Sequence, residues 1–396
     1  MSETLDQKPI ISVKNQFALV GILLASFAAP LCGALNIGAI IDKFNSSYMD
    51  AALVISIESL AISIMSMFIA RYTDYINHGF IKLKTIFIIG FIFIIIGNIS
   101  TIISIVYFNN IFPIYLVRAL SGLGTGAIVA TVMATVARHQ NAQMVFAYIN
   151  SGIGLATAIL FFISSRAITN FNLEGGYFVY LVFSSLLALV FIPIFKLTTS
   201  SINQEEINKT SYSGKIGWLA LIGVFLIFFA HSGLGIFGER IALSVKITTN
   251  SFGNLGIISG VLIIIGPLMA GIIGNKFGSL KPSIILLFIL LMSVYFTANS
   301  WKPIIFFIAF PIFGLMPIMW TPIFLGAMSY LDQSGRLAAA HPAFVTMAGA
   351  LSPIVMGYIL DNSSFSQVGW IVIAIMAIGI PLIILGTKLS DKIRYS

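Results

Sequence analysis

The sequence predicts an all-α polytopic membrane protein with twelve transmembrane helices in two six-helix bundles related by pseudo-two-fold symmetry. Three observations predict this fold class. Of the 396 residues, 58% are hydrophobic and only 9% are charged, whereas soluble proteins carry roughly 25% charged residues. The apolar residues form twelve runs, and a helix of about 20 residues is enough to cross a bilayer. The second half of the chain also repeats features of the first, as in transporters built from two parallel bundles.

The limits of the spans are set by Gly, Pro, Asn and charged residues that interrupt the apolar runs. The first run is too long for the apolar region of a signal peptide and lacks a strongly basic leader, so we expect it to be a retained helix. A polar stretch separates two groups of six spans. The expected spans are 17–41, 49–70, 85–106, 112–136, 143–166, 176–196, 216–238, 251–274, 282–299, 303–330, 341–360 and 368–388.

Basic residues predict the orientation of these spans, because cytoplasmic loops carry an excess of Lys and Arg. With both termini in the cytoplasm, fifteen bases face the cytoplasm, five face outward and Arg118 lies inside the membrane. The cytoplasmic bases are Lys8, Lys14, Arg71, Lys82, Lys84, Arg138, Lys196, Lys209, Lys215, Lys276, Lys281, Arg336, Lys388, Lys392 and Arg394; the outward ones are Lys43, Arg166, Arg240, Lys246 and Lys302. We therefore expect a multi-pass protein of the plasma (cell inner) membrane. The net charge of +8 then reflects orientation and anionic headgroups, and no nucleic acid partner.

An internal repeat predicts the domain organisation. We expect an N-terminal six-helix bundle over 1–196, a cytoplasmic linker over 197–215 and a C-terminal six-helix bundle over 216–396. The seventh span repeats the first at an offset of 202, where Leu19, Gly21, Leu24, Phe27, Ala28 and Gly33 fall on Leu221, Gly223, Leu226, Phe229, Ala230 and Gly235. Arg138 falls on Arg336 at an offset of 198. The alternative is a twelve-helix protein whose low-complexity sequence only mimics a repeat.

The loops after the second and eighth spans carry a motif that resembles a signature of the major facilitator superfamily, G-x-x-x-D-[RK]-x-G followed by basic residues. The second copy has Asn in place of the acid and consists of Gly271, Asn275, Lys276, Gly278 and Lys281. The first copy departs further, with Ala70 for the opening glycine, Asp74 kept, Tyr75 for the base, and a late Gly79 before Lys82 and Lys84. The resemblance implies cytoplasmic gate loops that latch neighbouring helix ends and stabilise one transport state. The alternative is that these short basic loops reflect orientation alone.

The fourth span resembles the same family, because Arg118 precedes Gly122, Gly124 and Gly126. Major facilitator proteins place an intramembrane Arg ahead of small residues, and such residues let helices approach closely. The resemblance also implies that the first, fourth, seventh and tenth helices line a cavity. The fifth span lacks the proline of many drug/proton antiporters, which disfavours an exporter.

Three ionisable residues fall within spans: Glu58, Arg118 and His231. A charge at the centre of a spanning helix costs about 2.5 to 3.5 kcal/mol, so each needs a reason to be there. At 1.5 Å per residue the three lie about 9 to 14 Å below the outer boundary, and one cavity can include them all. In the functional interpretation Glu58 couples protons, Arg118 is its counter-charge or clamps an anionic substrate group, and His231 relays protons or donates a hydrogen bond. In the structural interpretation Glu58 and Arg118 form an ion pair and His231 is a satisfied interface residue.

The tenth span contains Pro311, Pro317 and Pro322 around Trp320. Prolines in a span are tolerated where the helix faces protein or a water-filled cavity, so we expect a bent gating helix. Trp320 is a candidate pocket residue, although an aromatic residue in a span more often packs. Asn36 and Asn150 are further pocket candidates.

The predicted function is secondary active transport of a small organic solute by alternating access, coupled to protons. A single cysteine and four scattered histidines predict no metal site, and we expect no cofactor and no enzyme activity. No ATP-binding motif is present, so a gradient must supply the energy. The expected partners are the solute, protons and the lipid bilayer, with the monomer as the functional unit. The alternatives are a drug or metabolite efflux antiporter of the same fold and, from other classes, a non-transporting receptor or scaffold or a membrane-embedded enzyme.

Overall fold

The computed structural model describes residues 11–46, 48–73, 82–108, 110–196, 214–235, 237–247, 249–360 and 363–395. These residues form helices joined by short connections, and eleven helices among them are long and apolar enough to cross a membrane. The predicted all-α polytopic fold is therefore confirmed. Lys8, Asp74, Gly79, Lys209 and most of the linker 197–215 lie outside the described residues.

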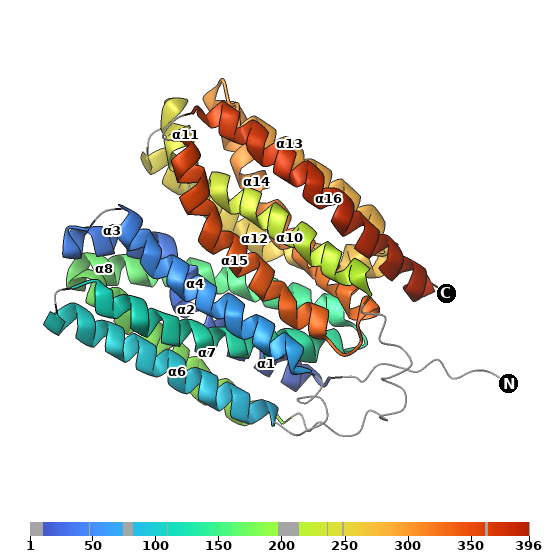
Figure 1. Ribbon diagram of the computed structural model, residues 1–396, viewed down its shortest axis with the longest axis horizontal. Helices are drawn as coiled ribbons and strands as arrows, with labels where there is room; N and C mark the ends of the chain where they lie inside the picture. The colour runs from blue at the N-terminus through green and yellow to red at the C-terminus, as the bar shows by residue number, and fades with distance from the viewer. Residues whose placement is uncertain are drawn as a thin grey trace.

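Figure 1 shows two groups of helices. The first group comprises α1 (Val13–Ser26), α2 (Ala28–Leu31), α3 (Gly33–Phe44), α4 (Tyr48–Arg71), α6 (Leu83–Ile103), the π-helix η1 (Ser104–Phe108), α7 (Phe112–Ala137) and α8 (Ala142–Ile194). The second comprises α10 (Lys215–Gly235), α11 (Gly238–Ser244), α12 (Thr249–Phe277), α13 (Leu280–Ala298), α14 (Pro303–Leu331), α15 (Arg336–Leu360) and α16 (Phe365–Tyr395). We call these the first and second halves. The domain boundaries at 197 and 215 remain a prediction.

The first span is not one helix but the three segments α1, α2 and α3, with breaks at Phe27 and Cys32. Pro30 explains the first break, because a proline lacks the N–H that would bond to the carbonyl four residues earlier. That carbonyl belongs to Ser26, and the Thr125 hydroxyl of α7 donates to it at 3.0 Å. The span is therefore broken at a point where a neighbouring helix replaces the lost hydrogen bond.

The fifth and sixth spans are joined without a loop. Helical hydrogen bonding continues through α8, but Phe171 and Asn172 have non-helical backbone angles, and Asn172 has a φ of 56°. With a ψ of −159°, Asn172 lies outside the left-handed helical region, in a conformation that residues other than Gly rarely adopt. The chain turns here, and Gly175 packs so closely against the Ala167 carbonyl that a side chain would not fit. The turn is tighter than the nine-residue interval, 167–175, expected between the two spans.

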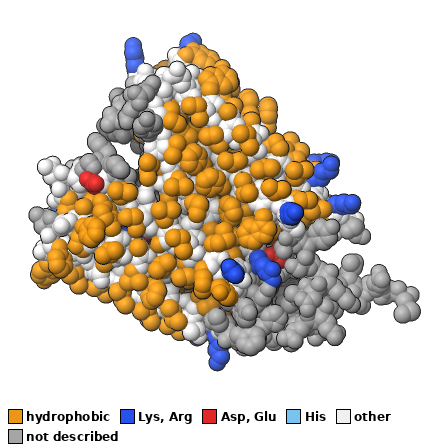
Figure 2. Space-filling view, in the orientation of Figure 1, with side chains coloured by type: hydrophobic (Ala, Val, Ile, Leu, Met, Phe, Trp, Pro, Cys, Tyr) orange, Lys and Arg blue, Asp and Glu red, His pale blue; other side chains and the backbone are white. Residues whose placement is uncertain are grey.

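The outer surface is apolar, as a membrane protein requires. Figure 2 shows hydrophobic side chains over most of the visible face, with several of the basic ones near the end of the molecule where α1 begins and α16 ends. Large apolar side chains are exposed on several helices, among them Ile285 on α13, Leu189 on α8 and Ile92 on α6. We call the end where α1 begins and α16 ends the termini end, and the opposite one the far end.

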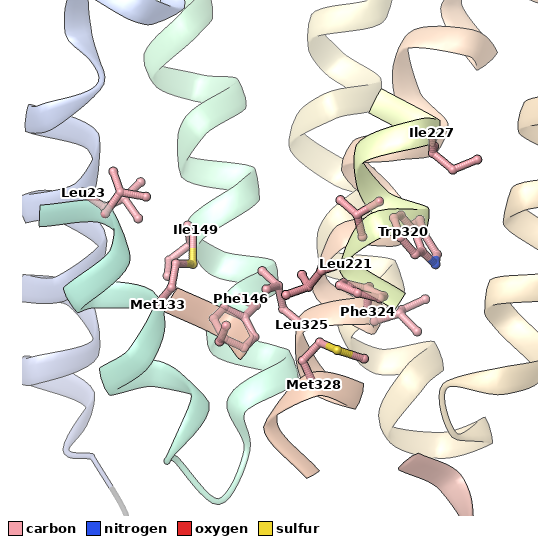
Figure 3. Close-up of a cluster of buried hydrophobic side chains, with 14 of the residues drawn as sticks. Leu23, Met133, Phe146, Ile149, Leu221, Ile227, Trp320, Phe324, Leu325 and Met328 are labelled. Carbon is pink, nitrogen blue, oxygen red and sulfur yellow. The ribbon is translucent and has the colours of Figure 1, made fainter. Parts of the chain in front are cut away.

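The two halves meet through α4 against α15, and through α8 against α12 and α14. A buried apolar cluster lies between them, and Figure 3 shows its members from both sides. The first half contributes Leu23, Met133, Phe146 and Ile149, and the second contributes Leu221, Trp320, Phe324, Leu325 and Met328. Several of these residues lie within a few turns of the termini end of their helices. The halves are thus sealed against each other by side chains that exclude water.

Candidate functional site

Glu58 and Arg118 form an ion pair between α4 and α7. The Arg118 Nε donates to Glu58 Oε2 at 3.1 Å, and its Nη2 donates to Glu58 Oε1. Arg118 is 0% exposed and Glu58 is 6% exposed. A buried charge without a partner is costly in an apolar medium, so each residue needs the other in order to remain ionised.

The remaining contacts of Arg118 come from two further helices. Its Nη1 donates to the Asn98 Oδ1 of α6 at 2.8 Å, and the Tyr177 ring of α8 lies 5.1 Å from the guanidinium carbon. An arginine can donate several hydrogen bonds in a fixed plane, and three of them are used here. Arg118 thereby joins four helices of the first half at one buried point.

The glycines that follow Arg118 place α7 directly against its neighbours. A side chain at Gly122 would collide with the Glu58 backbone carbonyl, and one at Gly126 would lie 3.0 Å from the Ile62 Cα. On the other face, Gly124 packs against the Gly90 carbonyl of α6. This spacing of small residues lets helix backbones touch. Gly122 lies one turn after Arg118 on α7, and its close contact places the Glu58 backbone beside Arg118. The packing of α4 against α7 therefore explains the expected ion pair.

His231 does not contact this pair in the structure. Its Nε2 donates to the Phe313 carbonyl at 3.2 Å, and its ring stacks on that of Phe313 with centroids 4.2 Å apart. Pro317 lies four residues after Phe313 and cannot supply the helical N–H for that carbonyl. His231 therefore satisfies a hydrogen-bond acceptor that a proline leaves open, which fits the structural interpretation of this residue.

The three pocket candidates are buried and already hydrogen-bonded. The Asn36 Oδ1 accepts from the Tyr180 hydroxyl at 2.9 Å, and the Asn150 Nδ2 donates to the carbonyl of Phe146 in its own helix at 2.8 Å. The Trp320 Nε1 donates to the Ser283 hydroxyl of α13 at 3.0 Å. Each of these three hydrogen bonds joins residues of the same half. The role of the three residues in a substrate pocket remains a prediction.

The loop between α12 and α13 is held by the last helix. Gly278 has a φ of 78°, which favours glycine. The Asp391 carboxylate then accepts from the backbone N–H groups of Ser279 and Leu280 at 2.7 and 2.8 Å. Arg394 donates to the carbonyls of Gly274 and Asn275 at 3.0 and 2.8 Å. One acid and one base of α16 thus fix both sides of the turn.

Asn275 connects the two halves at the termini end. Its Nδ2 donates to the Asn141 Oδ1 at 2.8 Å, directly before α8. Lys276 in the last turn of α12 and Lys281 in the first turn of α13 are exposed, as are Lys82 and Lys84 at the start of α6. The residue that replaces the motif's acid therefore makes a neutral hydrogen bond between the halves. Whether the two loops gate transport remains a prediction.

Asp391→Ala is expected to lower the free energy of unfolding by about 1 to 2 kcal/mol, because it leaves two N–H groups at the start of α13 without an acceptor. A thermal unfolding curve of the purified protein measures the change. Lys392→Ala is the matched control, since Lys392 is exposed on the next position of the same helix. Equal unfolding midpoints for the two variants would show that the carboxylate does not hold this turn.

Several partners of the candidate residues were not predicted from the sequence. Asn98 and Tyr177, which contact Arg118, and Tyr180, which bonds to Asn36, all lie in spans and have no motif around them. Their polar side chains in apolar runs are the signal that was available. Among the described residues, no three His, Cys, Asp or Glu side chains gather closely enough to hold a metal ion.

Comparison with known proteins identifies the family. The family model of the Major Facilitator Superfamily matches residues 17–340. No curated protein matches the chain by sequence.

Solved structures share the fold at low sequence identity. The transporter FucP in the outward conformation has a TM-score of 0.70 at 14% identity, covering 94% of this chain and 98% of that chain. The human organic anion transporter MFSD10 has a TM-score of 0.72 at 12% identity, covering 93% and 99%. The proton:xylose symporter XylE has a TM-score of 0.69 at 12% identity, covering 93% and 94%. The family match over most of the chain, together with this shared fold, shows that the chain belongs to the Major Facilitator Superfamily of membrane transporters.

Proposed function

We propose that the protein is a secondary active transporter that couples movement of a small organic solute to protons by alternating access. The observation that carries this proposal is the ion pair of Glu58 and Arg118, which is buried inside the spanning part of a transporter fold. A protein that needs only stability gains little from such a pair, since well-packed apolar residues serve as well or better. A carboxylate held there can instead bind and release a proton during the cycle.

The contacts of Arg118 suggest how a proton and a solute are coupled. In the structure, Glu58 neutralises the guanidinium and Asn98 accepts a further hydrogen bond from it. A proton on Glu58 removes the negative charge, and Arg118 is then a buried cation without a counter-ion. An anionic group of a solute can replace the lost charge. We therefore favour a solute that carries a carboxylate or phosphate, moved together with a proton.

The structurally similar proteins are consistent with this proposal but do not carry it. XylE is described as a proton:xylose symporter, FucP of E. coli as a fucose:proton symporter, and MFSD10 as an organic anion transporter. One fold hosts many solutes, so the substrate must be argued from the site.

A two-step experiment tests the proposal. A thermal-shift screen of sugars, organic acids and phosphate esters finds solutes that stabilise the purified protein by mass action. Counterflow in proteoliposomes then asks whether a stabilising solute crosses the membrane. We expect at least one solute to do both. A receptor would bind a solute without counterflow, and an enzyme would convert it to another compound.

The membrane orientation is a further part of the proposal, with the termini end in the cytoplasm of a plasma (cell inner) membrane protein that works as a monomer. Reporter fusions near Lys8, at Lys209 in the linker and after Arg394 are expected to report a cytoplasmic location, because fifteen of the bases then lie on that side. A fusion after Lys302, in the loop between α13 and α14, is expected to report an outside location. A linker that faces outward would overturn this topology.

In this orientation the gate loops also have a proposed role. The loop around Asn275 bonds to Asn141 of the first half, and the loop with Asp74, Lys82 and Lys84 is proposed to act with it on the cytoplasmic side. Contacts there favour the state that is closed to the cytoplasm. They change the balance of states and do not touch the solute.

A further inference from the structure

A lateral groove of about 750 Å³ lies between the two halves, toward the termini end. One wall is α4 and the other is formed by α10 and α15, and α4 and α15 lie side by side in Figure 1. At its base the Ser63 hydroxyl donates to the Ala343 carbonyl at 2.8 Å, so the helices are in contact below the groove. Ile64, Met67 and Phe68 on one wall are exposed apolar side chains of a spanning helix, so the groove opens sideways, toward the bilayer.

The walls of the groove are apolar along most of its length. Ile64, Met67 and Phe68 line it from α4, and Phe344 and Met347 line it from α15. Ile64 is 63% exposed and Phe68 is 55% exposed, which in a membrane protein means contact with lipid chains. From Arg71 to Ile64 is about 10 Å along α4, and from Arg336 to Met347 is about 16 Å along α15, at 1.5 Å per residue. This length suits the upper part of an acyl chain.

Two arginines line the groove at its termini end, one from each half. Arg71 is the last residue of α4, and Arg336 is the first residue of α15. Arginine binds phosphate through several hydrogen bonds at once. A groove with apolar walls and a doubly basic end at the membrane surface is complementary to one type of molecule, an amphipathic anion.

We propose that this groove binds one anionic phospholipid, with its phosphate between Arg71 and Arg336 and an acyl chain along Ile64, Met67, Phe68 and Met347. The lipid is favoured over a soluble anion because the apolar walls are open to the bilayer, where phospholipid is abundant. Because its walls come from both halves, the bound lipid stabilises the arrangement in which the halves are closed at the termini end. The site is separate from Glu58, and the inference does not depend on the identity of the transported solute.

Native mass spectrometry of the full-length protein in detergent tests the proposal, with phosphatidylglycerol as the anionic probe and phosphatidylcholine as the neutral one. We expect one phosphatidylglycerol to bind with clear preference over phosphatidylcholine. A basic residue near a membrane surface contributes about fivefold to the binding of an anionic lipid. Arg71→Gln is therefore expected to weaken binding about fivefold, and Arg71→Gln with Arg336→Gln about 30-fold.

The matched control is the double variant Lys388→Gln and Lys392→Gln, which removes two exposed charges from α16 at the same end of the molecule. It is expected to bind phosphatidylglycerol like the unchanged protein. Arg71→Gln alters a single exposed side chain, so it keeps the test decisive if the double arginine variant does not fold. Equal binding of the two lipids, equal losses in the control and the arginine variants, or displacement of the lipid by equimolar inorganic phosphate would each overturn the proposal.

Discussion

Arg118→Ala is expected to lower the free energy of unfolding by about 3 to 5 kcal/mol, because it leaves the buried Glu58 carboxylate without its counter-charge. It also removes the hydrogen bond to Asn98 and the contact with Tyr177. In protein that still folds, we expect proton-driven uptake and solute exchange to fall together, since the proposed anion partner is gone. Thermal unfolding and transport per folded molecule measure the two effects.

The double variant Glu58→Leu with Arg118→Met separates stability from function. It removes both charges and fills the site with apolar side chains, and such replacements are often neutral or stabilising. We expect its unfolding midpoint to return toward that of the unchanged protein, while coupled transport stays lost. If Arg118→Ala keeps the normal midpoint, the pair is not the buried, mutually dependent unit that the structure describes.

Glu58→Gln is expected to abolish solute accumulation driven by a proton gradient and to spare exchange of solute across the membrane. Glutamine keeps the size of the side chain and an oxygen that accepts from Arg118, but it cannot take up and release a proton. Accumulation and counterflow are measured in the same proteoliposomes, so that the amount of folded protein cancels in their ratio.

Asn98→Ala is the matched control for Glu58→Gln. It removes another hydrogen bond to Arg118 at the same depth, but Asn98 does not titrate. We expect a loss of stability while accumulation and counterflow keep their normal ratio. Full proton-driven accumulation by Glu58→Gln would mean that Glu58 is not the coupling group, and His231 would then be tested in the same way.

Depth along the spans was enough to predict part of the site. Glu58 and Arg118 lie at similar depths in two spans, and a buried charge requires a partner, so their pairing could be expected. The glycines after Arg118 also pointed to close packing. The same argument placed His231 with this pair, and the structure instead shows it bonded to Phe313 in the second half.

Two prolines explain hydrogen bonds between helices that could not be predicted from the sequence. Pro30 frees the Ser26 carbonyl and Pro317 frees the Phe313 carbonyl, and each is bonded by a side chain of another helix, Thr125 and His231 respectively. A sequence shows which carbonyl a proline frees, but the partner depends on which helices are neighbours in space. The bonds of Asp391 to the start of α13 join residues more than 100 positions apart, and no local pattern encodes them.

Transport by alternating access requires the two halves to move apart at the termini end. The most direct measurement is the distance between spin labels at Gln140 and Lys276, which are exposed next to the Asn141–Asn275 contact. The labels are attached to introduced cysteines after Cys32, which is buried, has been replaced by alanine. We predict two distance populations in lipid bilayers, a short one that matches this structure and a longer one whose share changes with pH or with a transported solute. A single short distance under all these conditions would contradict the account.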